Sequence, residues 1–496
     1  MKLSQLLSVY SQLSWGEFAT SEVSQVCVDS RQVKPGCVFV AIKGYSSDGH
    51  DFLPQVCHQG AIAVVVEDRS QVPLDYAGAV VVVNDTRVEL DRLASRFYED
   101  PAKNFFCVGV TGTNGKTSTA YMVEKILTDF GWPTGVMGTI DHHLGKHRWS
   151  SQLTTPDPLT LQKRLCEFNA LGAKAAVFEV SSHALHQYRA DHIPFDVMVF
   201  TNLTRDHLDY HSDMDHYFKA KQRLFREIPL TQTQKSSVAV INTDDPYGRQ
   251  MEIAPHVKRT TYGKAEADLK FNQIEAGFGG TRFHLSTPRG EAKVFLPIPG
   301  EHNVYNAVAA IGVGLAAGVS LKACTESLSQ FSGVPGRLEK VPESKKVHVF
   351  VDYAHTDQAL NAVLSTLQAV RQASSQAGSR IFVVYGCGGG RDKGKRPLMA
   401  KVAAEGADVA ILTSDNPRHE DPRTIIEDGL VAVPKDLMGQ SFFVEEDRRK
   451  AIAMALNMAN NGDVVLVAGK GHEDYQIIGD EKRPFSDVQV VREILA

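Results

Sequence analysis

Residues 105–131 read FFCVGVTGTNGKTSTAYMVEKILTDFG, and this stretch contains the pattern from which the fold can be predicted. The apolar run at 105–110 predicts a buried strand, and apolar residues then recur at helical spacing until Gly131, a residue type that commonly ends helices. Between them, Gly112 and Gly115 let the backbone turn so that its N–H groups face phosphate oxygens. Lys116 can reach the β- and γ-phosphates, and the Thr117 hydroxyl can bind Mg²⁺. The stretch therefore predicts a strand–loop–helix unit that binds a nucleoside triphosphate.

One position departs from the general phosphate-loop pattern. That pattern places a glycine five residues before Gly115, where this chain has Val110, and Gly109 comes one residue earlier. A purely structural glycine turn is the alternative interpretation. The strand before the loop and the helix after it favour phosphate binding.

Length and composition exclude several classes of protein. The chain has 496 residues, enough for about three domains. It is 43% hydrophobic and 22% charged with a formal net charge of −5, which argues against a nucleic-acid binder that works by bulk charge. Seven dispersed cysteines argue for a reducing compartment. The N-terminal segment lacks the apolar core of a signal peptide and every apolar run is too short to span a bilayer, so we expect a cytoplasmic protein.

Two linkers divide the chain into three α/β domains. The segment EDPAKNFF (99–106) leads into the strand before the glycine loop, and SGVPGRLE (332–339) is rich in glycine and proline. We therefore predict domains at 1–103, 104–336 and 337–496. Short apolar runs alternate with helical stretches in all three, which predicts largely parallel sheets, and two-residue alternation at 268–297 predicts an appended antiparallel hairpin.

Acidic and polar residues follow two further strands of the middle domain. Glu179 stands near the end of the predicted strand 175–180, and TNLTRDHLDYH (201–211) follows the next strand. A lone buried acid or histidine is usually structural. Several such residues at successive strand ends, beside a phosphate loop, instead predict a Mg²⁺ and phosphate site. The nearby basic stripe of HYFKAKQRLF (216–225) fits a solvent-facing helix.

A second unusual loop, ILTSDNPRHED (411–421), follows a strand of the third domain. Asn-Pro is a common turn signal, so these residues by themselves favour a turn. Three other strands of this domain also end in polar or glycine-rich loops, and ligands of parallel α/β sheets gather at the C-terminal ends of strands. Both interpretations remain open on this evidence.

The glycine loop also resembles a known family. The form TGTNGKT (111–117) is that of the ATP loop in the Mur ligases, the ATP-dependent amino-acid ligases of peptidoglycan synthesis, and in the related folylpolyglutamate synthase. Further motifs fall in order along the whole chain. The resemblance implies a central P-loop ATPase-type sheet flanked by an N-terminal UDP-sugar-binding α/β domain and a C-terminal Rossmann-like α/β domain.

The same resemblance implies a catalytic set. Lys116 would act on the phosphates, and Glu179 and His207 would bind Mg²⁺ together with Thr117. Lys221 occupies the family position at which a lysine is carbamylated by CO₂ (N6-carboxylysine) and becomes a further Mg²⁺ ligand. The expected cofactors are therefore ATP as substrate, Mg²⁺ and the carbamate on Lys221.

The resemblance also assigns binding residues for two substrates. For ATP these are Gly112, Thr113, Asn114, Gly115, Lys116, Thr117, Ser118, Asn303, Arg337 and Asp352. Helix capping and packing is the alternative role for Asn303. Motifs of the branch that adds the third residue of the peptide imply contacts to a UDP-sugar-peptide from Val28, Ser30, Tyr45, Ser46, Ser47, Leu153, Thr154, Thr155, Ser181, Gln187 and Arg189. The family proline after Thr356 is replaced by Asp357.

For the incoming amino acid, the resemblance implies a pocket made of Arg391, Asp415, Asn416, Pro417, Arg418, Gly469 and Glu473. The D-N-P-R form belongs to the enzymes that use meso-diaminopimelate, and Arg418 can pair bidentately with its second carboxylate. The implied activity is ligation of meso-diaminopimelate to the D-Glu γ-carboxylate of UDP-MurNAc-L-Ala-D-Glu through an acyl phosphate. The expected partners are these small molecules, with no nucleic acid and no membrane span, and the expected oligomeric state is a monomer.

Three alternatives remain. The same ligase could take L-lysine if Arg418 served only the main carboxylate. Folylpolyglutamate synthase and the ligase that adds D-Ala-D-Ala share the glycine loop, but the segments DSR (29–31), TTP (154–156) and DNPR (415–418) argue against both. From another class, a non-catalytic ATP-dependent switch or scaffold would not require Lys116, Glu179, His207 and Lys221 to be intact.

Overall fold

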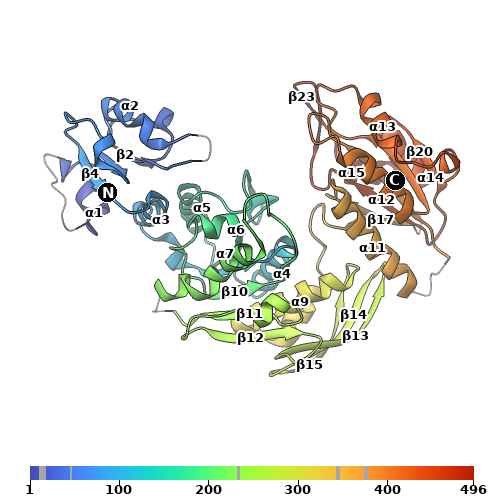
Figure 1. Ribbon diagram of the computed structural model, residues 1–496. Helices are drawn as coiled ribbons and strands as arrows, with labels where there is room; N and C mark the ends of the chain where they lie inside the picture. The colour runs from blue at the N-terminus through green and yellow to red at the C-terminus, as the bar shows by residue number, and fades with distance from the viewer. Residues whose placement is uncertain (11–17, 45–46, 232–234, 342–346, 374–377) are drawn as a thin grey trace. The chain divides into compact units, whose positions relative to one another are not determined.

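The computed structural model describes residues 1–10, 18–44, 47–231, 235–341, 347–373 and 378–496 (Figure 1). Internal contacts divide the chain into two compact units. The first unit comprises residues 1–267 and 312–319, and the second comprises 268–311 and 320–496. Each unit is described by itself below.

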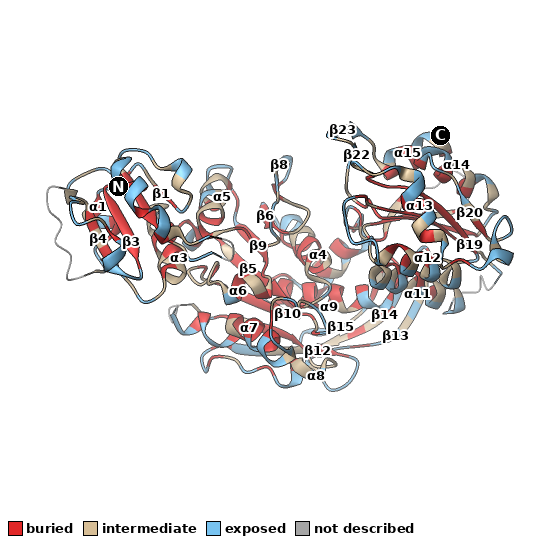
Figure 2. Cartoon of the chain, turned by 45° about the horizontal axis from the view of Figure 1, so that its top comes forward, coloured by how far each residue is buried: buried red, intermediate tan, exposed pale blue. Residues whose placement is uncertain are grey.

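The first unit begins with a four-stranded parallel sheet in the order β1-β2-β3-β4. Its strands and helices are β1 (Gln25–Cys27), β2 (Cys37–Val40), β3 (Ala63–Val66), β4 (Ala79–Val82), α1 (Leu3–Leu6), α2 (Leu53–His58) and α3 (Thr86–Phe97). Every residue of β2 and β3 is buried, as is typical of parallel strands covered on both faces. This burial, shown in red in Figure 2, explains why the sequence of each of these strands is a continuous apolar run.

The middle part of the first unit contains six parallel strands in the order β12-β11-β10-β5-β9-β6, and the antiparallel strands β7 and β8 extend the β6 edge. The strands are β5 (Phe106–Thr111), β6 (Thr134–Met137), β7 (Asp141–Leu144), β8 (His147–Ser150), β9 (Ala175–Glu179), β10 (Val197–Phe200), β11 (Val238–Asn242) and β12 (Lys258–Gly263). The helices are α4 (Lys116–Asp129), α5 (Pro158–Ala170), α6 (Ser182–His186), α7 (Met214–Arg226) and α8 (Pro246–Arg249). Strands β5, β9 and β10 are neighbours, so the loops that follow them meet at one edge of the sheet.

The second unit begins with an antiparallel sheet of three strands, β13 (Leu269–Gly277), β14 (Gly280–Thr287) and β15 (Gly290–Leu296). The sequence predicted an antiparallel hairpin here, and the structure adds a third strand to it. Helices α9 (Glu301–Ala316, whose last five residues belong to the first unit) and α10 (Leu321–Ser329) follow.

The rest of the second unit is a six-stranded sheet in the order β16-β17-β21-β18-β19-β20, in which only β16 is antiparallel to its neighbour. Its strands are β16 (Glu339–Val341), β17 (His348–Asp352), β18 (Ile381–Cys387), β19 (Val409–Ser414), β20 (Phe442–Val444) and β21 (Val464–Ala468), followed by the hairpin of β22 (Tyr475–Ile478) and β23 (Glu481–Pro484). Helices α11 (Asp357–Ala373), α12 (Lys395–Gly406) and α13 (Pro422–Leu430) cover one face, and α14 (Arg448–Met458) and α15 (Asp487–Leu495) cover the other. All four strands predicted for this domain are present, and the loops after β17, β18, β19 and β21 share one edge.

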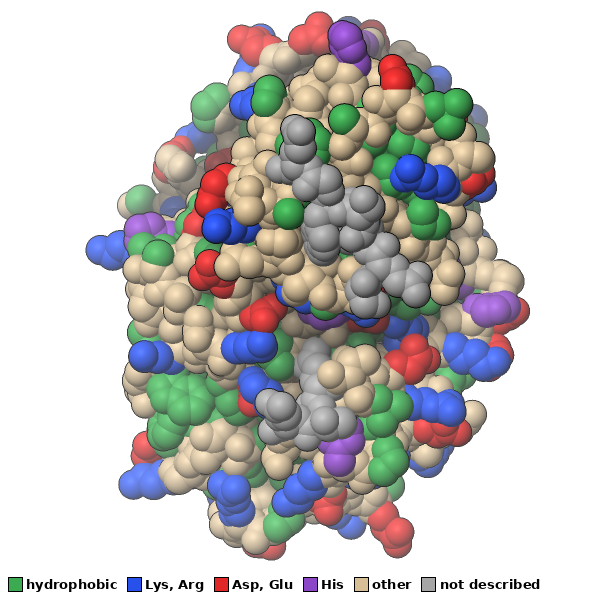
Figure 3. Space-filling model, turned by 90° about the vertical axis from the view of Figure 1, so that its left-hand side faces the viewer, with side chains coloured by type: hydrophobic (Ala, Val, Ile, Leu, Met, Phe, Trp, Pro, Cys, Tyr) green, Lys and Arg blue, Asp and Glu red, His purple; other side chains and the backbone are tan. Residues whose placement is uncertain are grey.

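The surface carries no obvious single-sign field on the face shown in Figure 3, where acidic and basic side chains are interspersed. This mixture agrees with the small net charge of −5. Among the residues that the structure describes, no helix is long and apolar enough to cross a membrane.

Candidate active site

The glycine loop connects β5 to α4 as the sequence predicted. Gly112 has a φ of 151°, and a β-carbon there would lie 1.9 Å from Thr201 Oγ1, so only glycine fits. Gly115 has a φ of 85°, in the left-handed region, directly before the first residue of α4. These two positions turn the chain sharply between strand and helix.

Residues after β10 hold the glycine loop in place. The Thr113 N–H donates to the Asn202 carbonyl over 2.9 Å, and the Asn114 N–H donates to Asn202 Oδ1 over 3.0 Å. The Thr201 hydroxyl donates to the Asn114 carbonyl over 2.6 Å. The TNLTRDH segment and the loop therefore form one rigid edge.

Two lysines converge on a single carbonyl of this loop. Lys116 Nζ and Lys221 Nζ each donate to the Gly112 carbonyl over 2.9 Å, and Lys116 also donates to the Thr113 carbonyl over 2.8 Å. Lys221 is only 1% exposed, and its Nζ lies 4.6 Å from the centre of the Tyr217 ring. Burial, and then the neighbouring Lys116, hold the pKa of Lys221 well below its ordinary value. The environment therefore disfavours the charged form of Lys221, and the helix face that carries Lys221 is buried rather than solvent-facing.

Glu179, at the end of β9, is 1% exposed, and both of its carboxylate oxygens accept hydrogen bonds. One carboxylate oxygen, Oε2, accepts from the hydroxyls of Thr117 and Thr139, each over 3.0 Å, and Oε1 accepts from the Thr139 N–H over 3.0 Å. The Thr139 hydroxyl also lies 3.1 Å from Thr154 Oγ1. Sequence reasoning did not single out Thr139, because a threonine after a short strand carries no distinctive motif.

His207 belongs to an aromatic group at the same edge. Its ring centre lies 4.9 Å from that of His183, and the His183 ring is 5.7 Å from His211. Burial is the main cause that lowers the pKa of His183 and His207, and burial together with the neighbouring histidines lowers the pKa of His211 to about 4. Neutral imidazoles can ligate metal ions. Within the described ranges, however, no three His, Cys, Asp or Glu side chains form a ready metal cluster.

The residues expected to hold the sugar-peptide also gather near Glu179. The Thr155 hydroxyl donates to the Glu179 carbonyl over 2.8 Å and accepts from the Ser181 N–H over 3.0 Å. Arg189 Nη1 donates to the Thr155 carbonyl over 3.0 Å, and Arg189 Nε donates to Gln187 Oε1 over 3.1 Å. Leu153 is 49% exposed.

In the N-terminal sheet, Val28 is 37% exposed and Ser30 lies in a short 3-10 turn whose neighbours, Asp29 and Arg31, form an ion pair of 2.7 Å. Ser47 is exposed. Tyr45 and Ser46 lie outside the described residues.

The expected nucleotide residues of the second unit are mostly buried. Asn303 Nδ2 donates to the Pro299 carbonyl over 2.8 Å, and Asn303 Oδ1 accepts from Asn306 Nδ2 over 3.2 Å. Bonds of this kind agree with the alternative role of Asn303 in helix capping and packing. Asp352 accepts from the N–H groups of Leu338 and Ala354 over 2.7 and 2.8 Å, and burial raises its pKa. The Arg337 guanidinium lies 5.4 Å from the centre of the Tyr353 ring.

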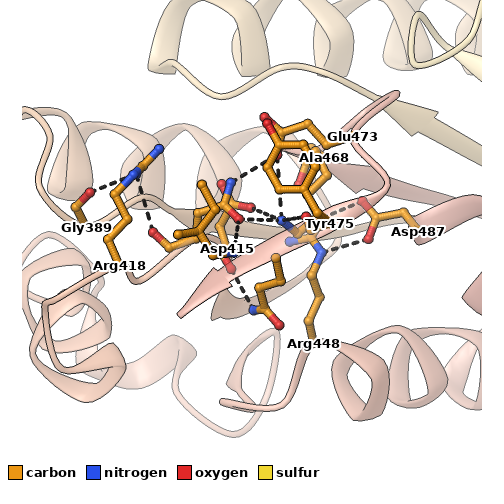
Figure 4. A network of polar contacts seen from close by, with 12 residues as sticks. Gly389, Asp415, Arg418, Arg448, Ala468, Glu473, Tyr475 and Asp487 are labelled. Carbon is orange, nitrogen blue, oxygen red and sulfur yellow. Dashed lines mark hydrogen bonds and ion pairs between the residues drawn. The ribbon is translucent and has the colours of Figure 1, made fainter. Parts of the chain in front are cut away.

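The DNPR loop after β19 lies beside the loops after β18 and β21. Arg418 Nη1 donates to the Gly389 carbonyl over 2.8 Å, and Asn416 Nδ2 donates to Glu473 Oε2 over 3.0 Å. Figure 4 shows the Arg418 guanidinium turned toward Gly389, on the opposite side of Asp415 from Arg448 and Asp487. Arg391 is exposed, and Gly469 has a φ of 116°, where a β-carbon would lie 3.8 Å from Asp415 Oδ2. The structure therefore brings the predicted pocket residues together.

Arg418 itself adopts a φ of 54°, which is uncommon for a side-chain-bearing residue. Its N–H donates to the Ile477 carbonyl over 3.0 Å, and its carbonyl accepts from the Gly479 N–H over 2.7 Å. These two bonds to the β22–β23 hairpin hold the strained backbone in place. The segment is thus both a turn and a positioned loop, so the two sequence interpretations are compatible.

Sequence reasoning missed the centre of this pocket, Lys470. It is 0% exposed, and its Nζ lies 3.1 Å from Asp415 Oδ1 and 3.7 Å from Glu473 Oε2. The signal was present in AGKGHED (468–474), where a lysine follows a buried strand between two glycines. Arg448, bound to Asp487 by two hydrogen bonds of 2.7 Å, was missed as well.

A glycine loop of the phosphate-binding form on one parallel sheet, and a second parallel sheet with charged loops at its C-terminal edge, fit an ATP-dependent ligase that joins an acid to an amino acid. Three family models match in order: Mur ligase family, catalytic domain (residues 22–98), Mur ligase middle domain (110–314) and Mur ligase, glutamate ligase domain (336–471). The chain belongs to the Mur ligase family.

Individual relatives agree along the whole chain. The UDP-N-acetylmuramoyl-L-alanyl-D-glutamate--2,6-diaminopimelate ligase of Geobacillus thermodenitrificans is 43% identical over 498 residues, covering 99% of both chains. The ligase of the same name from Listeria monocytogenes serotype 4b is 42% identical over 489 residues, covering 98% of this chain and 97% of its own. A solved structure of a ligase with this name is 32% identical with a TM-score of 0.74, covering 100% of this chain and 98% of that one.

Proposed function

We propose that this chain joins meso-diaminopimelate to the D-Glu γ-carboxylate of UDP-MurNAc-L-Ala-D-Glu, with hydrolysis of ATP to ADP and phosphate, in the synthesis of peptidoglycan precursors. The observation that carries the choice of amino acid is Arg418. Its guanidinium bonds only backbone carbonyls, and within the part of the chain that the structure describes it has no carboxylate partner. An arginine beside a group of acids, yet not paired with them, is suited to the second carboxylate of diaminopimelate.

The reaction runs in two stages. The D-Glu γ-carboxylate attacks the γ-phosphorus of ATP, so that ADP leaves and an acyl phosphate forms. The neutral amine of diaminopimelate then attacks the acyl carbon, and the tetrahedral intermediate collapses to an amide with loss of phosphate and a proton. Backbone N–H groups of residues 112–118 and the Lys116 ammonium stabilise the charge on the transferred phosphoryl group. No side-chain nucleophile is needed, so positioning supplies most of the rate.

For Mg²⁺ we propose Thr117, Glu179, His207 and a carbamylated Lys221 as the ligand set. The residues fit the ion chemically, because Glu179 offers carboxylate oxygens, His207 a neutral imidazole, and Lys221 an amine whose lowered pKa favours reaction with CO₂. The carbamate would replace a buried amine by an oxygen-donating anion. Mg²⁺ bound there would supply charge neutralisation for the phosphoryl group.

For the other substrates we propose the residues that the family motifs mark. Asn303, Arg337 and Asp352 would contact the nucleotide, and the bonds that Asn303 makes to Pro299, just before its helix, and to Asn306 favour an orienting role for it. The sugar-peptide would contact Val28, Ser30 and 45–47 at its nucleotide end. Its peptide end would contact residues 153–155, Ser181, Gln187 and Arg189.

We also propose the domain boundaries at 1–103, 104–336 and 337–496, a cytoplasmic location and a monomeric state. The three family-model ranges support the boundaries, since 22–98, 110–314 and 336–471 fall within or close to them. The absence of a membrane-crossing helix among the described residues is compatible with the location.

The test is ADP release from ATP and Mg²⁺ with UDP-MurNAc-L-Ala-D-Glu, supplying meso-diaminopimelate or L-lysine. Turnover with diaminopimelate and little with lysine is expected. Turnover with lysine instead would keep the ligase class but contradict the proposed role of Arg418. ATP turnover without either amino acid, and without product, would favour the switch alternative.

A further inference from the structure

Figure 4 shows a polar network that includes Asp415, Glu473 and Tyr475, and the buried Lys470 side chain contacts all three of these residues. Its Nζ contacts four groups: Asn416 Oδ1 and the Tyr475 carbonyl, each at 2.9 Å, Asp415 Oδ1 at 3.1 Å, and Glu473 Oε2 at 3.7 Å. The lysine is 0% exposed, so these contacts are not loosened by solvent. Asp415 Oδ1 has no hydrogen-bond partner in the part of the chain that the structure describes, so its contact there is the ion pair with Lys470.

These contacts determine which way the Asn416 amide faces. Asn416 Oδ1 accepts from Lys470 Nζ and from the Ile477 N–H, both over 2.9 Å. Because both of these groups are donors, the amide atom that faces them must be the oxygen. The amide nitrogen Nδ2 therefore faces Glu473 Oε2, at 3.0 Å. Removing Lys470 deletes one of the two donors that fix this orientation.

The orientation in turn leaves defined groups for a ligand. Glu473 Oε2 is engaged by Asn416 and Lys470, while Oε1 makes no hydrogen bond within the described ranges. Arg418 uses only Nη1, toward the carbonyls of Gly389 and Asn416, so its Nε and Nη2 are not committed to the described protein groups. A carboxylate oxygen and a guanidinium edge thus lie on loops that the same network fixes, which suits an ammonium and a carboxylate on one carbon atom.

We infer that Lys470 is a positioning residue of the amino-acid pocket. It does not contact the amino acid. It neutralises Asp415 and Glu473 and locks the Asn416 amide, so that Glu473 and the DNPR loop present their free groups to the ligand. This inference rests on the proposed function of the pocket, and it predicts that loss of Lys470 raises the KM for diaminopimelate while leaving the phosphorylation step unchanged.

The experiment compares Lys470→Met with the wild-type full chain. The expected result is a KM for diaminopimelate raised at least about 10-fold, with the KM values for ATP and UDP-MurNAc-L-Ala-D-Glu within about twofold of wild type. Formation of the acyl phosphate, trapped with hydroxylamine in the absence of amino acid, is expected to be unchanged. Lys401→Met is the matched control, because Lys401 is a 61%-exposed lysine of the same unit that pairs with Glu405 one turn along α12.

A second variant separates positioning from charge balance. Lys470→Met combined with Asp415→Asn removes one positive and one negative charge, so it is expected to lose less stability than Lys470→Met alone. Its KM for diaminopimelate is expected to stay above that of Asp415→Asn alone, because the Asn416 amide has still lost the Lys470 donor. Recovery of the KM to within about twofold of wild type would overturn the positioning role, and so would an unchanged KM in Lys470→Met.

Failure of the proposed function gives a different result. In that case the wild-type chain shows no ADP release that depends on diaminopimelate, whatever happens to the variants. Equal loss of acyl-phosphate formation and of diaminopimelate affinity in both Lys470 variants would show a general structural defect and overturn the inference.

Discussion

Lys221 and Lys470 are both buried lysines at the C-terminal edge of a parallel sheet, yet their surroundings are opposite. Lys221 donates to one carbonyl and lies beside another lysine. Lys470 is surrounded by two carboxylates, an amide oxygen and a carbonyl. Both lysines are buried, so their neighbouring groups make the difference: the surroundings of Lys221 disfavour its charged form, whereas those of Lys470 offer two carboxylates to pair with it.

The largest expected effect comes from Lys221. We expect Lys221→Met to lower kcat by about 10³-fold, because the variant cannot form the carbamate that would help hold Mg²⁺, the ion that would neutralise charge on the phosphoryl group. Both acyl-phosphate trapping and ADP release measure this loss. Supplying ¹³C-bicarbonate should give a carbamate signal by NMR in the wild-type protein and none in the variant. Full activity in the variant would remove the proposed chemical difference between the two lysines.

The second prediction compares stability. Lys470→Met should reduce the free energy of unfolding by about 3–5 kcal/mol, because it leaves buried carboxylates without their cation. Lys221→Met should cost less than about 1 kcal/mol, since it also relieves the proximity of Lys116. Urea unfolding of the unliganded proteins measures both values. Equal losses would show that the two environments do not differ in the way their contacts suggest.

The third prediction concerns Arg418, whose guanidinium donates to backbone carbonyls and has no carboxylate partner among the described residues. Arg418→Ala should raise the KM for diaminopimelate by about 10- to 100-fold, because charge-assisted hydrogen bonds contribute about 1.5–3 kcal/mol. Alanine at this position has the same unfavourable backbone φ of 54° as arginine. The change in KM between the two proteins therefore reports the loss of the guanidinium and not a change in backbone strain. Steady-state kinetics with diaminopimelate and with lysine check this expectation. A similar KM change for ATP would instead indicate a disturbed fold.

The smallest effect is a pH dependence of stability. The folded-state pKa of Lys221 is lowered by burial and Lys116, so between that pKa and the ordinary value of 10.5 the unfolded chain binds more protons. Wild type should therefore gain stability relative to Lys221→Met as pH rises within this window, by up to about 1.4 kcal/mol per pH unit. Urea unfolding of both proteins between about pH 7.5 and 9.5, in buffer free of bicarbonate, measures the slope. If the difference in unfolding free energy between the two proteins did not change with pH, the Lys221 amine would remain charged in the folded protein.

Much of the fold follows from local sequence patterns. The run FFCVGV, the glycine loop and the helical spacing after it correctly predicted the strand β5, the turn and α4, because the required φ values at Gly112 and Gly115 suit glycine. The four strands of the last domain were also predicted, since parallel strands covered on both faces appear as short continuous apolar runs. The third strand at 290–296 was not predicted, because the pairing of a meander depends on neighbours rather than on composition.

The candidate site divides in the same way. Motif residues such as Lys116, Glu179 and Arg418 could be named from the sequence, because each occurs in a distinctive loop after an apolar strand. Thr139 and Lys470 could not, since their importance comes from contacts made across the fold, to Glu179 and to Asp415 and Asn416.

The sequence by itself determined the family, the order of the domains and the residue types at each loop, because these depend on spacing along the chain. Only the tertiary structure decided that Lys221 is buried beside another lysine, that Lys470 contacts two acids, and that the Arg418 guanidinium donates to backbone carbonyls. The physical reason is that charge state and hydrogen-bond partners depend on what lies within a few ångströms in space, and strand order in the sheets sets those distances.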